Sequence, residues 1–361
     1  RSHPDGIPGE GVSMKKVKKV LLIGLCGLLM LTGCGKSGET QQETDPKDDG
    51  KIQIGITFDT FVLERWQRDR DVFVSTAQEL GAEVNVQNAN GDIEEQCNQV
   101  NYFIDKGMDV IVLIQVASDT NQEMMLEAID RAQKEGIPVV AYDRLVLNAG
   151  VDLYISFDNK KVGTLMAEHM KEHLGGKGDI LQICGPLADY NVPQVMEGFS
   201  EVLNGTEMKI TETEHAQGWL SETGFSVTEN YLDKKGKPAG IMSGNDGIAG
   251  NAVRALSERS LAGNVCLVGQ DADLDACQRI VEGTQCMTVY KPVEQLSRRA
   301  AELSVKLAEG KELEVSETMN DGIYEVPYER LEPIAVTKEN MDEVITGKYH
   351  EESDVYLNVR K

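Results

Sequence analysis

Residues 109–144 read DVIVLIQVASDTNQEMMLEAIDRAQKEGIPVVAYDR, and this stretch decides the fold. The short apolar runs 109–116 and 138–144 are typical of buried strands. Between them, Asn121–Lys134 has helical periodicity and is followed by the stop signal Gly136-Ile-Pro138. Two strands joined by one helix lie parallel, with a right-handed crossover. The stretch therefore predicts a parallel sheet that is covered by helices.

The same alternation of short apolar runs and helical stretches continues along the chain. Glu64–Leu80 and Lys160–Leu174, for example, are both predicted helices that end at glycine. Ten strands are too many for one sheet of this kind but suit two sheets of about five. We therefore predict the α/β class, with two doubly wound parallel-sheet lobes joined by a hinge. The predicted strands are 51–58, 83–89, 109–116, 138–144, 152–158, 179–185, 209–216, 239–245, 264–271 and 285–291.

The boundary between the two lobes is expected near Ser156–Asn159. The helix predicted at 293–310 and the runs at Ile323–Val326 and Ile334–Val336 are too short for a third domain, so we expect them to complete the two lobes. The expected parts are 51–157 with about 292–321 for the first lobe, 158–291 with about 322–350 for the second lobe, and 351–361 as a tail.

The first 50 residues resemble an export signal and a tether. Lysines at 15–19 precede the apolar run Val20–Leu31, which is too short for a membrane span but typical of a secretory signal. Leu31-Thr-Gly-Cys34 is similar to the lipobox of bacterial lipoproteins, which predicts a lipid on Cys34 and a position at the outer face of the cytoplasmic membrane or in the periplasm. The expected parts are 1–13 as upstream or cloning-derived residues, 14–33 as the signal, and 34–50 as the lipidated Cys and a polar, flexible tether.

The composition excludes one class of partner. Sixty acidic and 36 basic residues give a formal net charge of -24. Nucleic-acid binding needs clustered Lys and Arg, so we expect no nucleic-acid partner.

Five cysteines remain after the signal and Cys34. Their number is odd and no C-x-x-C occurs, so we expect free, mostly buried thiols. They are Cys97, Cys184, Cys266, Cys277 and Cys286.

Polar or aromatic residues follow nearly every predicted strand. In open parallel sheets, ligands bind beyond the carboxyl ends of the strands. Some of these residues are helix caps, but together they offer groups that can grip neighbouring hydroxyls. Trp66 and Trp219 can lie against the C–H faces of a sugar ring, and no glycine-rich phosphate loop follows a strand. The set thus favours a small neutral polyol. It comprises Asp59, Gln115, Asp143, Arg144, Asp158, Asn159, Asp189, Asn191, Gln217, Trp219, Asn245, Asp246, Gln270, Asp271 and Lys291.

Signals for catalysis are weak. No G-x-S-x-G occurs, and the carboxylates of Asp271–Asp275 lack the Gly and Glu of a calcium loop. His169-Met-Lys-Glu172-His173 matches the H-x-x-E-H string of one class of metallopeptidases, which leaves such an enzyme as a remote alternative. A helix on the flank of a sheet is expected to offer neither a third ligand nor an open crevice. We therefore predict no enzymatic activity, no cofactor and no metal site.

Six strings in chain order resemble the periplasmic sugar-binding proteins of the ribose/galactose type, and within them the xylose-binding branch. The resemblance covers roughly residues 51–350. The strings are LERWQRDRD (63–71), QNANG (87–91), AYDR (141–144), YISFDNKKVG (154–163), GQDADL (269–274) and MTVYKP (287–292).

This resemblance implies a monomeric two-lobed clamp with three hinge strands that closes around one sugar. It implies D-xylose as the ligand, with glucose or another pentose as alternatives, and delivery to an ABC permease. Relatives can also present the sugar-bound form to a membrane histidine kinase or chemoreceptor, and the sequence leaves both roles open. Carried over by position, the sugar contacts are Arg65, Trp66, Asp143 and Arg144 in the first lobe, Asp189, Asn191, Trp219, Asn245 and Asp271 in the second, and Lys291 at a hinge crossing.

Overall fold

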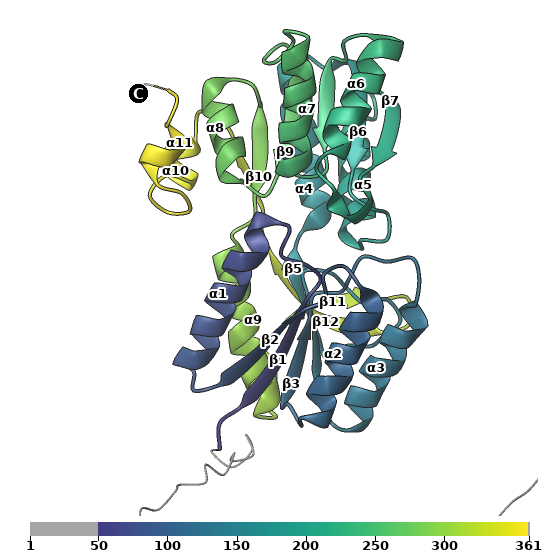
Figure 1. The fold of residues 1–361 in the computed structure, drawn as a ribbon, viewed down its shortest axis with the longest axis vertical. Helices are drawn as coiled ribbons and strands as arrows, with labels where there is room; N and C mark the ends of the chain where they lie inside the picture. The colour runs from purple at the N-terminus through teal and green to yellow at the C-terminus, as the bar shows by residue number, and fades with distance from the viewer. Residues whose placement is uncertain (1–49, 360–361) are drawn as a thin grey trace, which may run out of the picture. The chain divides into compact units, whose positions relative to one another are not determined.

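The structure is a computed structural model that describes residues 50–359 and contains two separate, mostly parallel sheets (Figure 1). All ten predicted strands are present, with ends that differ by up to three residues from the prediction. This confirms the predicted α/β class with two lobes. The predicted signal, Cys34 and nearly all of the predicted tether lie outside the described residues.

The sheet of the first lobe has seven strands, which are parallel except that β11 runs antiparallel to β12. Its central strands are apolar and buried along their whole length, as in the VIVL segment of β3. Such strands fit a sheet that is covered by helices on both faces. In sheet order the strands are β11 (Glu317–Asn320), β12 (Glu325–Leu331), β5 (Leu153–Phe157), β4 (Val139–Tyr142), β3 (Val110–Leu113), β1 (Gln53–Phe58) and β2 (Glu83–Asn88).

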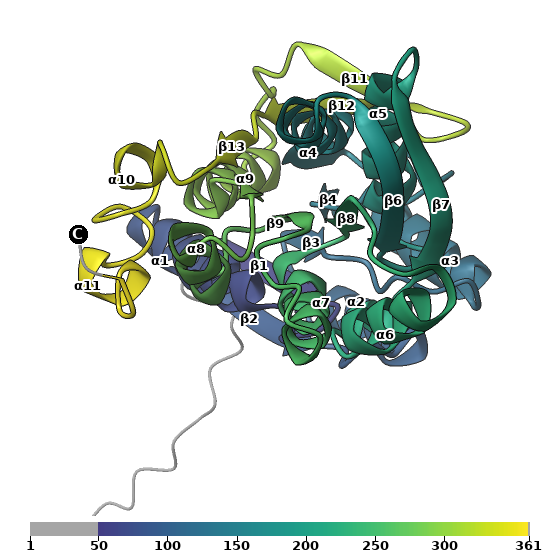
Figure 2. The ribbon, with the colours of Figure 1, turned by 90° about the horizontal axis from the view of Figure 1, so that it is seen from above.

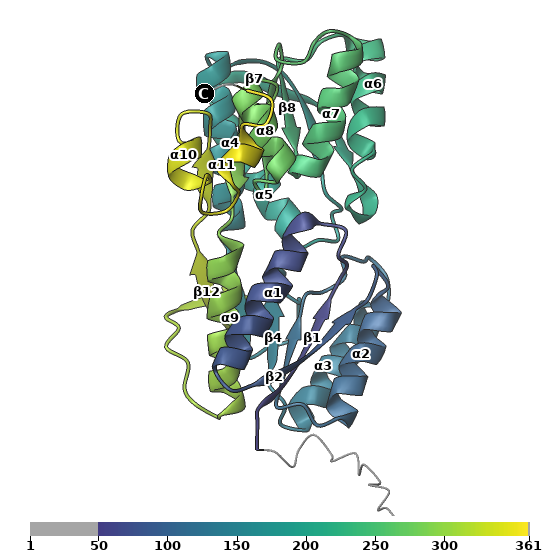
Figure 3. The same ribbon diagram turned by 60° about the vertical axis from the view of Figure 1, so that its left-hand side comes forward.

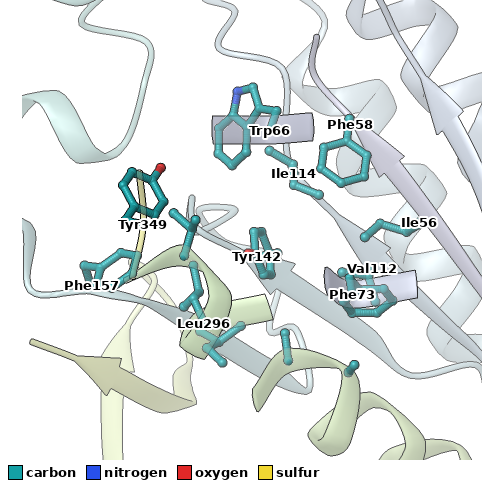
Figure 4. Packing of buried hydrophobic residues seen from close by; sticks show 14 of the residues in the cluster. Ile56, Phe58, Trp66, Phe73, Val112, Ile114, Tyr142, Phe157, Leu296 and Tyr349 are labelled. Atoms are coloured by element: carbon teal, nitrogen blue, oxygen red, sulfur yellow. The ribbon is translucent and has the colours of Figure 1, made fainter. Parts of the chain in front are cut away.

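Two helix pairs cover the faces of this sheet, α1 with α9 on one side and α2 with α3 on the other (Figure 3). Figure 4 shows residues of the first core, which includes Trp66 and Phe73 of α1, Leu296 of α9, and Ile56 and Val112 of the sheet. Helices and strands thus bury one continuous apolar layer. The bounds are α1 (Glu64–Glu79), α2 (Ile93–Asp105), α3 (Gln122–Lys134) and α9 (Val293–Ala308).

The second lobe repeats this plan around six strands, with β13 antiparallel to β10 at one edge. One core lies under α4 and α5 and another under α6 and α7. The strands are, in sheet order, β13 (Ile334–Val336), β10 (Met287–Tyr290), β9 (Cys266–Gln270), β8 (Gly240–Ser243), β6 (Lys177–Cys184) and β7 (Glu207–His215). The helices are α4 (Asn159–Leu174), α5 (Asn191–Leu203), α6 (Thr223–Lys235), α7 (Asp246–Glu258) and α8 (Leu274–Glu282).

The chain crosses between the lobes three times, after β5, after β10 and after β12. The prediction that residues 322–350 belong to the second lobe is wrong for β12, because Tyr328–Leu331 pair in parallel with Tyr154–Phe157 of β5. Without this pairing, β5 would be an uncovered edge of the first sheet. The third crossing therefore lies between β12 and β13.

The last described residues form two short helices beside α8, α10 (Met341–Val344) and α11 (Glu352–Val355) (Figure 2). Gln278 of α8 donates from Nε2 to the carbonyl of Asp354 at 2.8 Å, and Val355 is buried. The predicted tail thus packs on the second lobe up to residue 359.

Within residues 50–359, none of the helices has the length and apolar character that crossing a membrane requires. All five cysteines in this range are free and only Cys286 is partly exposed, as predicted.

Candidate functional site

All ten residues that were predicted to touch a ligand line one cavity. The cavity has about 510 Å³ of empty space when the open solvent at its mouth is included. Most of its lining residues follow the carboxyl ends of strands, where the topology of both sheets brings them together. They are Arg65, Trp66, Asp143, Arg144, Asp189, Asn191, Trp219, Asn245, Asp271 and Lys291.

Arg65 lies in the first turn of α1 and is almost completely buried. Its guanidinium pairs with Asp69 one turn later at 3.0 Å and with Asp143 after β4 at 2.8 Å. It also lies 4.2 Å from the centroid of the Trp66 ring. A guanidinium has five donors in a rigid fork, so these contacts fix its plane at the cavity wall.

Arg144 connects the two lobes. Its Nη1 donates to Asp59 Oδ2 at 2.6 Å and to the carbonyl of Gln115 at 2.8 Å, both in the first lobe. Its Nε lies 2.8 Å from Asp189 Oδ2 in the second lobe, but the angle there does not make a hydrogen bond. The contact is therefore an ion pair across the cavity, and Arg144 Nε is a donor that a ligand oxygen can use.

A chain of side-chain hydrogen bonds also joins the lobes. Asn191 at the start of α5 donates to Asp143 Oδ2 at 2.9 Å and accepts from Asn159 at 3.0 Å. Trp219 ends a short 3₁₀ helix (Gln217–Trp219) and donates from Nε1 to Asp189 Oδ2 at 3.1 Å. These bonds hold the Trp219 ring and the Asn191 amide in fixed positions.

The remaining predicted residues come from the ends of three strands in the second lobe. Lys291 after β10 pairs with Asp271 after β9, with 2.8 Å between Nζ and Oδ1. Asn245 after β8 caps α7 by accepting from the backbone N–H of Ile248 at 2.9 Å. Its oxygen is thus committed to the cap, which leaves the amide nitrogen as a donor for the cavity.

The charges on the cavity wall balance, with three cations and three carboxylates. Burial alone would raise the pKa of Asp143, but Arg65, followed by Lys291 and Arg144, holds that pKa below its ordinary value. For Asp189 the burial effect prevails over Arg144, and the pKa is raised. The wall therefore presents both donors and acceptors without a large net charge.

Three of the ten residues have a left-handed backbone. The φ angles are +66° for Asp143, +58° for Trp219 and +101° for Asp271. This region is uncommon for residues other than glycine, and for a bulky residue such as Trp it is an outlier. Strain of this kind collects at ligand sites, where surrounding contacts hold the residue in place.

The predicted contacts omit two polar residues of the cavity, Asn159 and Gln270. Both belong to the wider set that follows the strands, so the position after a strand was the signal that identified them. Within residues 50–359, Gln270 Oε1 and Trp66 Nε1 are buried and have no hydrogen-bond partner. Buried polar atoms are nearly always paired, so these two are candidates for bonds to a ligand.

The H-x-x-E-H string lies on α4, away from the cavity lining. The prediction that this helix face finds no third ligand is wrong, because Cys286 Sγ lies 4.0 Å from both ring nitrogens of His173. The reason is that α4 packs across the start of β10 and the neighbouring β9. Cys286 and His173 are 113 residues apart in the sequence, so no local sequence pattern predicts their contact.

The sequence and fold have clear relatives. A profile of the periplasmic binding protein domain matches residues 54–312. The D-xylose-binding periplasmic protein of Escherichia coli (strain K12) is 38% identical over 346 residues, which are 94% of this chain and all of that protein. Its counterpart in Haemophilus influenzae (strain Rd) is 40% identical over 311 residues, 84% of this chain and 92% of that one.

One solved structure is similar over nearly its whole length. An ABC transporter solute-binding protein from Clostridium phytofermentans, crystallised with bound β-D-glucose, has a TM-score of 0.75 and 25% identity. The match covers 84% of this chain and 99% of that one. Profile, relatives and structure agree, and the chain belongs to the periplasmic binding protein family.

Proposed function

We propose that this protein is an extracytoplasmic receptor that binds a neutral monosaccharide between its two lobes. The observation that carries the proposal is the balanced charge of the cavity wall. A charged ligand would leave one buried charge without compensation, which is costly. A sugar hydroxyl both donates and accepts, so it can bridge a carboxylate and a guanidinium. Hydrogen bonds to charged groups contribute about 1.5–3 kcal/mol each.

We propose D-xylose as the sugar. Equatorial hydroxyls leave both faces of xylopyranose with exposed C–H groups, and one tryptophan from each lobe lines the cavity. The relatives in E. coli and H. influenzae are D-xylose-binding proteins. The C. phytofermentans protein has bound β-D-glucose, which differs from xylose by one hydroxymethyl group. Glucose is therefore the competitor that matters most.

Isothermal titration calorimetry against a panel of sugars tests this proposal. The panel contains D-xylose, D-glucose, L-arabinose and D-ribose, with the charged sugar D-glucuronate as a probe of the neutral-ligand argument. We expect one D-xylose per protein, weaker binding of glucose and no binding of glucuronate. Absence of heat with every neutral sugar would refute sugar binding, and tighter binding of another sugar would refute the assignment to xylose.

We further propose that Cys34 anchors the receptor at the outer face of the cytoplasmic membrane. The lipobox-like string supports the anchor, and the periplasmic location of the named relatives supports export. In cells that express the full chain, Cys34→Ala should move the protein from the membrane fraction to the soluble fraction. Cys26→Ala is the matched control, since Cys26 would be removed with the signal. Equal distribution of the two variants would contradict the anchor.

The partner that we propose is an ABC permease, with the receptor acting as a monomer. Deletion of the gene should abolish high-affinity uptake of labelled xylose, and a copy of the gene should restore it. Normal uptake in the deletion strain would contradict a transport role. Loss of xylose-induced transcription under the same conditions would instead identify the receptor as the sensor that presents sugar to a membrane kinase.

A further inference from the structure

We propose that His169, His173 and Cys286 form a binding site for a divalent transition metal, Zn²⁺ first, on the second lobe. The two histidines lie one turn apart on α4, and Cys286 lies directly before β10. The ligand atoms of the three residues all lie within 4.8 Å of one another. This site is separate from the cavity that is proposed for sugar.

The distances are close to those of a metal site. Cys286 Sγ lies 4.0 Å from Nδ1 and Nε2 of His173, and the ring centroids of His169 and His173 are 6.4 Å apart. In a tetrahedral zinc site, bonds of about 2.0–2.1 Å to nitrogen and 2.3 Å to sulfur place these ligand atoms roughly 3.6 Å apart. The side chain of His173 is exposed, so a small rotation about its side-chain bonds closes the difference.

The donor set selects the class of metal. Imidazole binds Zn, Cu, Fe and Ni, and thiolate adds a preference for softer ions, so magnesium and calcium are excluded. Three protein ligands leave one position of a tetrahedron for water or for the sulfur of Cys266. The thiols of Cys266 and Cys286 are close enough to interact. Zn²⁺ accepts either water or the Cys266 sulfur as its fourth ligand, because its d electrons impose no preferred geometry.

The surroundings of the cluster also favour a bound cation. The Cys266 thiol and the rings of His169 and His173 all lie close enough to Cys286 to interact with it, and thiolate is the form in which cysteine binds metals. The carboxylate of Glu339 also lies near His169.

The position of the cluster points to a structural role. Asn159, at the start of α4, lines the cavity, and His169 lies ten residues further, about 15 Å along the helix. All three ligands belong to the second lobe. A metal ion there would fasten α4 to β10 and stabilise this lobe, and it would leave the sugar contacts unchanged.

Cobalt titration of the full-length protein, first reduced and freed of metal with a chelator, tests the proposal. We expect one Co²⁺ per protein with a thiolate-to-cobalt charge-transfer band, displacement by Zn²⁺, and a higher Tm with zinc. Cys286→Ser should abolish the band, and both Cys286→Ser and His173→Ala should weaken zinc binding at least about 10-fold, since loss of even an outer partner has that effect. Glu172→Gln, on the same helix, is the matched control and should bind zinc like the wild type.

Two results would overturn the site. One is absence of the charge-transfer band in the wild type. The other is zinc affinity that stays unchanged in both Cys286→Ser and His173→Ala, which would identify adventitious surface binding. D-xylose titration of each variant verifies the fold. His173→Ala changes an exposed side chain, so it keeps the test valid if Cys286→Ser does not fold.

Discussion

Trp219 combines an unusual backbone with a fixed side chain. Its φ of +58° costs about 1–3 kcal/mol. The ring lies against Gly185, where a Cβ would come within 2.3 Å of a ring carbon, and Nε1 is bonded to Asp189. The strain is retained because these contacts hold the ring at the cavity wall, where it can stack on a sugar.

Trp219→Ala should therefore weaken D-xylose binding by at least about 10-fold, equivalent to about 1.4 kcal/mol, while Tm changes little. The ring supplies the stacking surface, and it is only partly buried where it packs against the two cores of the second lobe. Calorimetric titration measures the affinity. The neighbouring and exposed Leu220 offers the control, Leu220→Ala, which should bind like the wild type. Equal affinities for both variants would remove Trp219 from the site.

Asp246 is a second residue with an unusual environment. It is fully buried at the start of α7, and its oxygens accept from Thr288 at 2.7 Å and from Gln285 at 2.8 Å. Burial is the main cause that raises the pKa of Asp246 to about 7 from an ordinary value of 3.8. Between pH 4 and 7 the folded protein therefore keeps a proton that the unfolded chain has lost. The contribution of Asp246 to the free energy of unfolding therefore falls as the pH rises from 4 to 7.

The pH dependence of Tm should consequently be shallower in Asp246→Asn than in the wild type between pH 5 and 8. Other buried carboxylates with raised pKa values, such as Asp69 and Asp189, act in the same direction. The difference between the two proteins therefore reports Asp246 together with its electrostatic neighbour Asp273. Scanning calorimetry at several pH values measures it. Asp119→Asn, at an exposed position, is the control. Parallel curves for Asp246→Asn and the wild type would contradict the shifted pKa.

At the scale of elements, two glycines determine how α4 and α5 cross. A Cβ on Gly163 would lie 1.9 Å from the carbonyl oxygen of Val195, and one on Gly198 would lie 1.9 Å from that of Lys160. No side chain fits at such distances, so the helix backbones touch. The two helices begin at Asn159 and Asn191, the amide pair that reaches Asp143. The crossing therefore positions part of the ligand site.

Gly163→Ala should destabilise the protein by about 1–3 kcal/mol, the usual cost of overpacking, and should also weaken sugar binding because the amide pair shifts. Urea unfolding and calorimetric titration measure the two effects. Glu168→Ala changes an exposed position of the same helix and should stay within about 0.5 kcal/mol of the wild type. Wild-type stability of the Gly163→Ala protein would contradict this prediction, because it would mean that α4 and α5 can move apart without a loss of stability.

Local sequence patterns predicted the helices and strands well, but they did not predict contacts between segments that are distant in the sequence. The helix ends at Lys134 and Leu174 were predictable because glycine follows each closely. The ten cavity residues were identified by position after strands and by the family resemblance. The return of β12 to the first sheet and the contact of Cys286 with His173 depend on packing between distant segments. Leu80, the last residue of the helix predicted at Glu64–Leu80, is exposed because α1 already ends at Glu79.

At the scale of the whole described chain, contacts between the lobes lie both at the cavity and beside it. Arg144 and Asp189 pair across the cavity. On another side, Arg68 of α1 donates to the carbonyl of Tyr349 at 2.9 Å, next to the C-terminal helices. One buried hydrophobic cluster also contains residues of both lobes. Buried ion pairs contribute little net stability, so we expect a bound sugar to add to the energy that couples the lobes.

D-xylose at 100 times its Kd should therefore stabilise the folded protein by about 2.7 kcal/mol and make both lobes unfold in one transition. Scanning calorimetry with and without the sugar measures this. An equal concentration of sucrose, a disaccharide, is the control and should leave the transition unchanged. Unfolding that is unaffected by D-xylose, or two transitions that remain separate in its presence, would contradict coupling through the ligand.

The three crossings also determine the order in which the protein can be made. β12 is built from residues 325–331 but lies next to β5 in the first sheet. A chain that emerges N-terminus first on the far side of a membrane cannot complete its first lobe until almost all of it has arrived. Contacts between such distant segments also slow folding. Until β12 arrives, the edge of β5 is unpaired and open to wrong pairing with other chains.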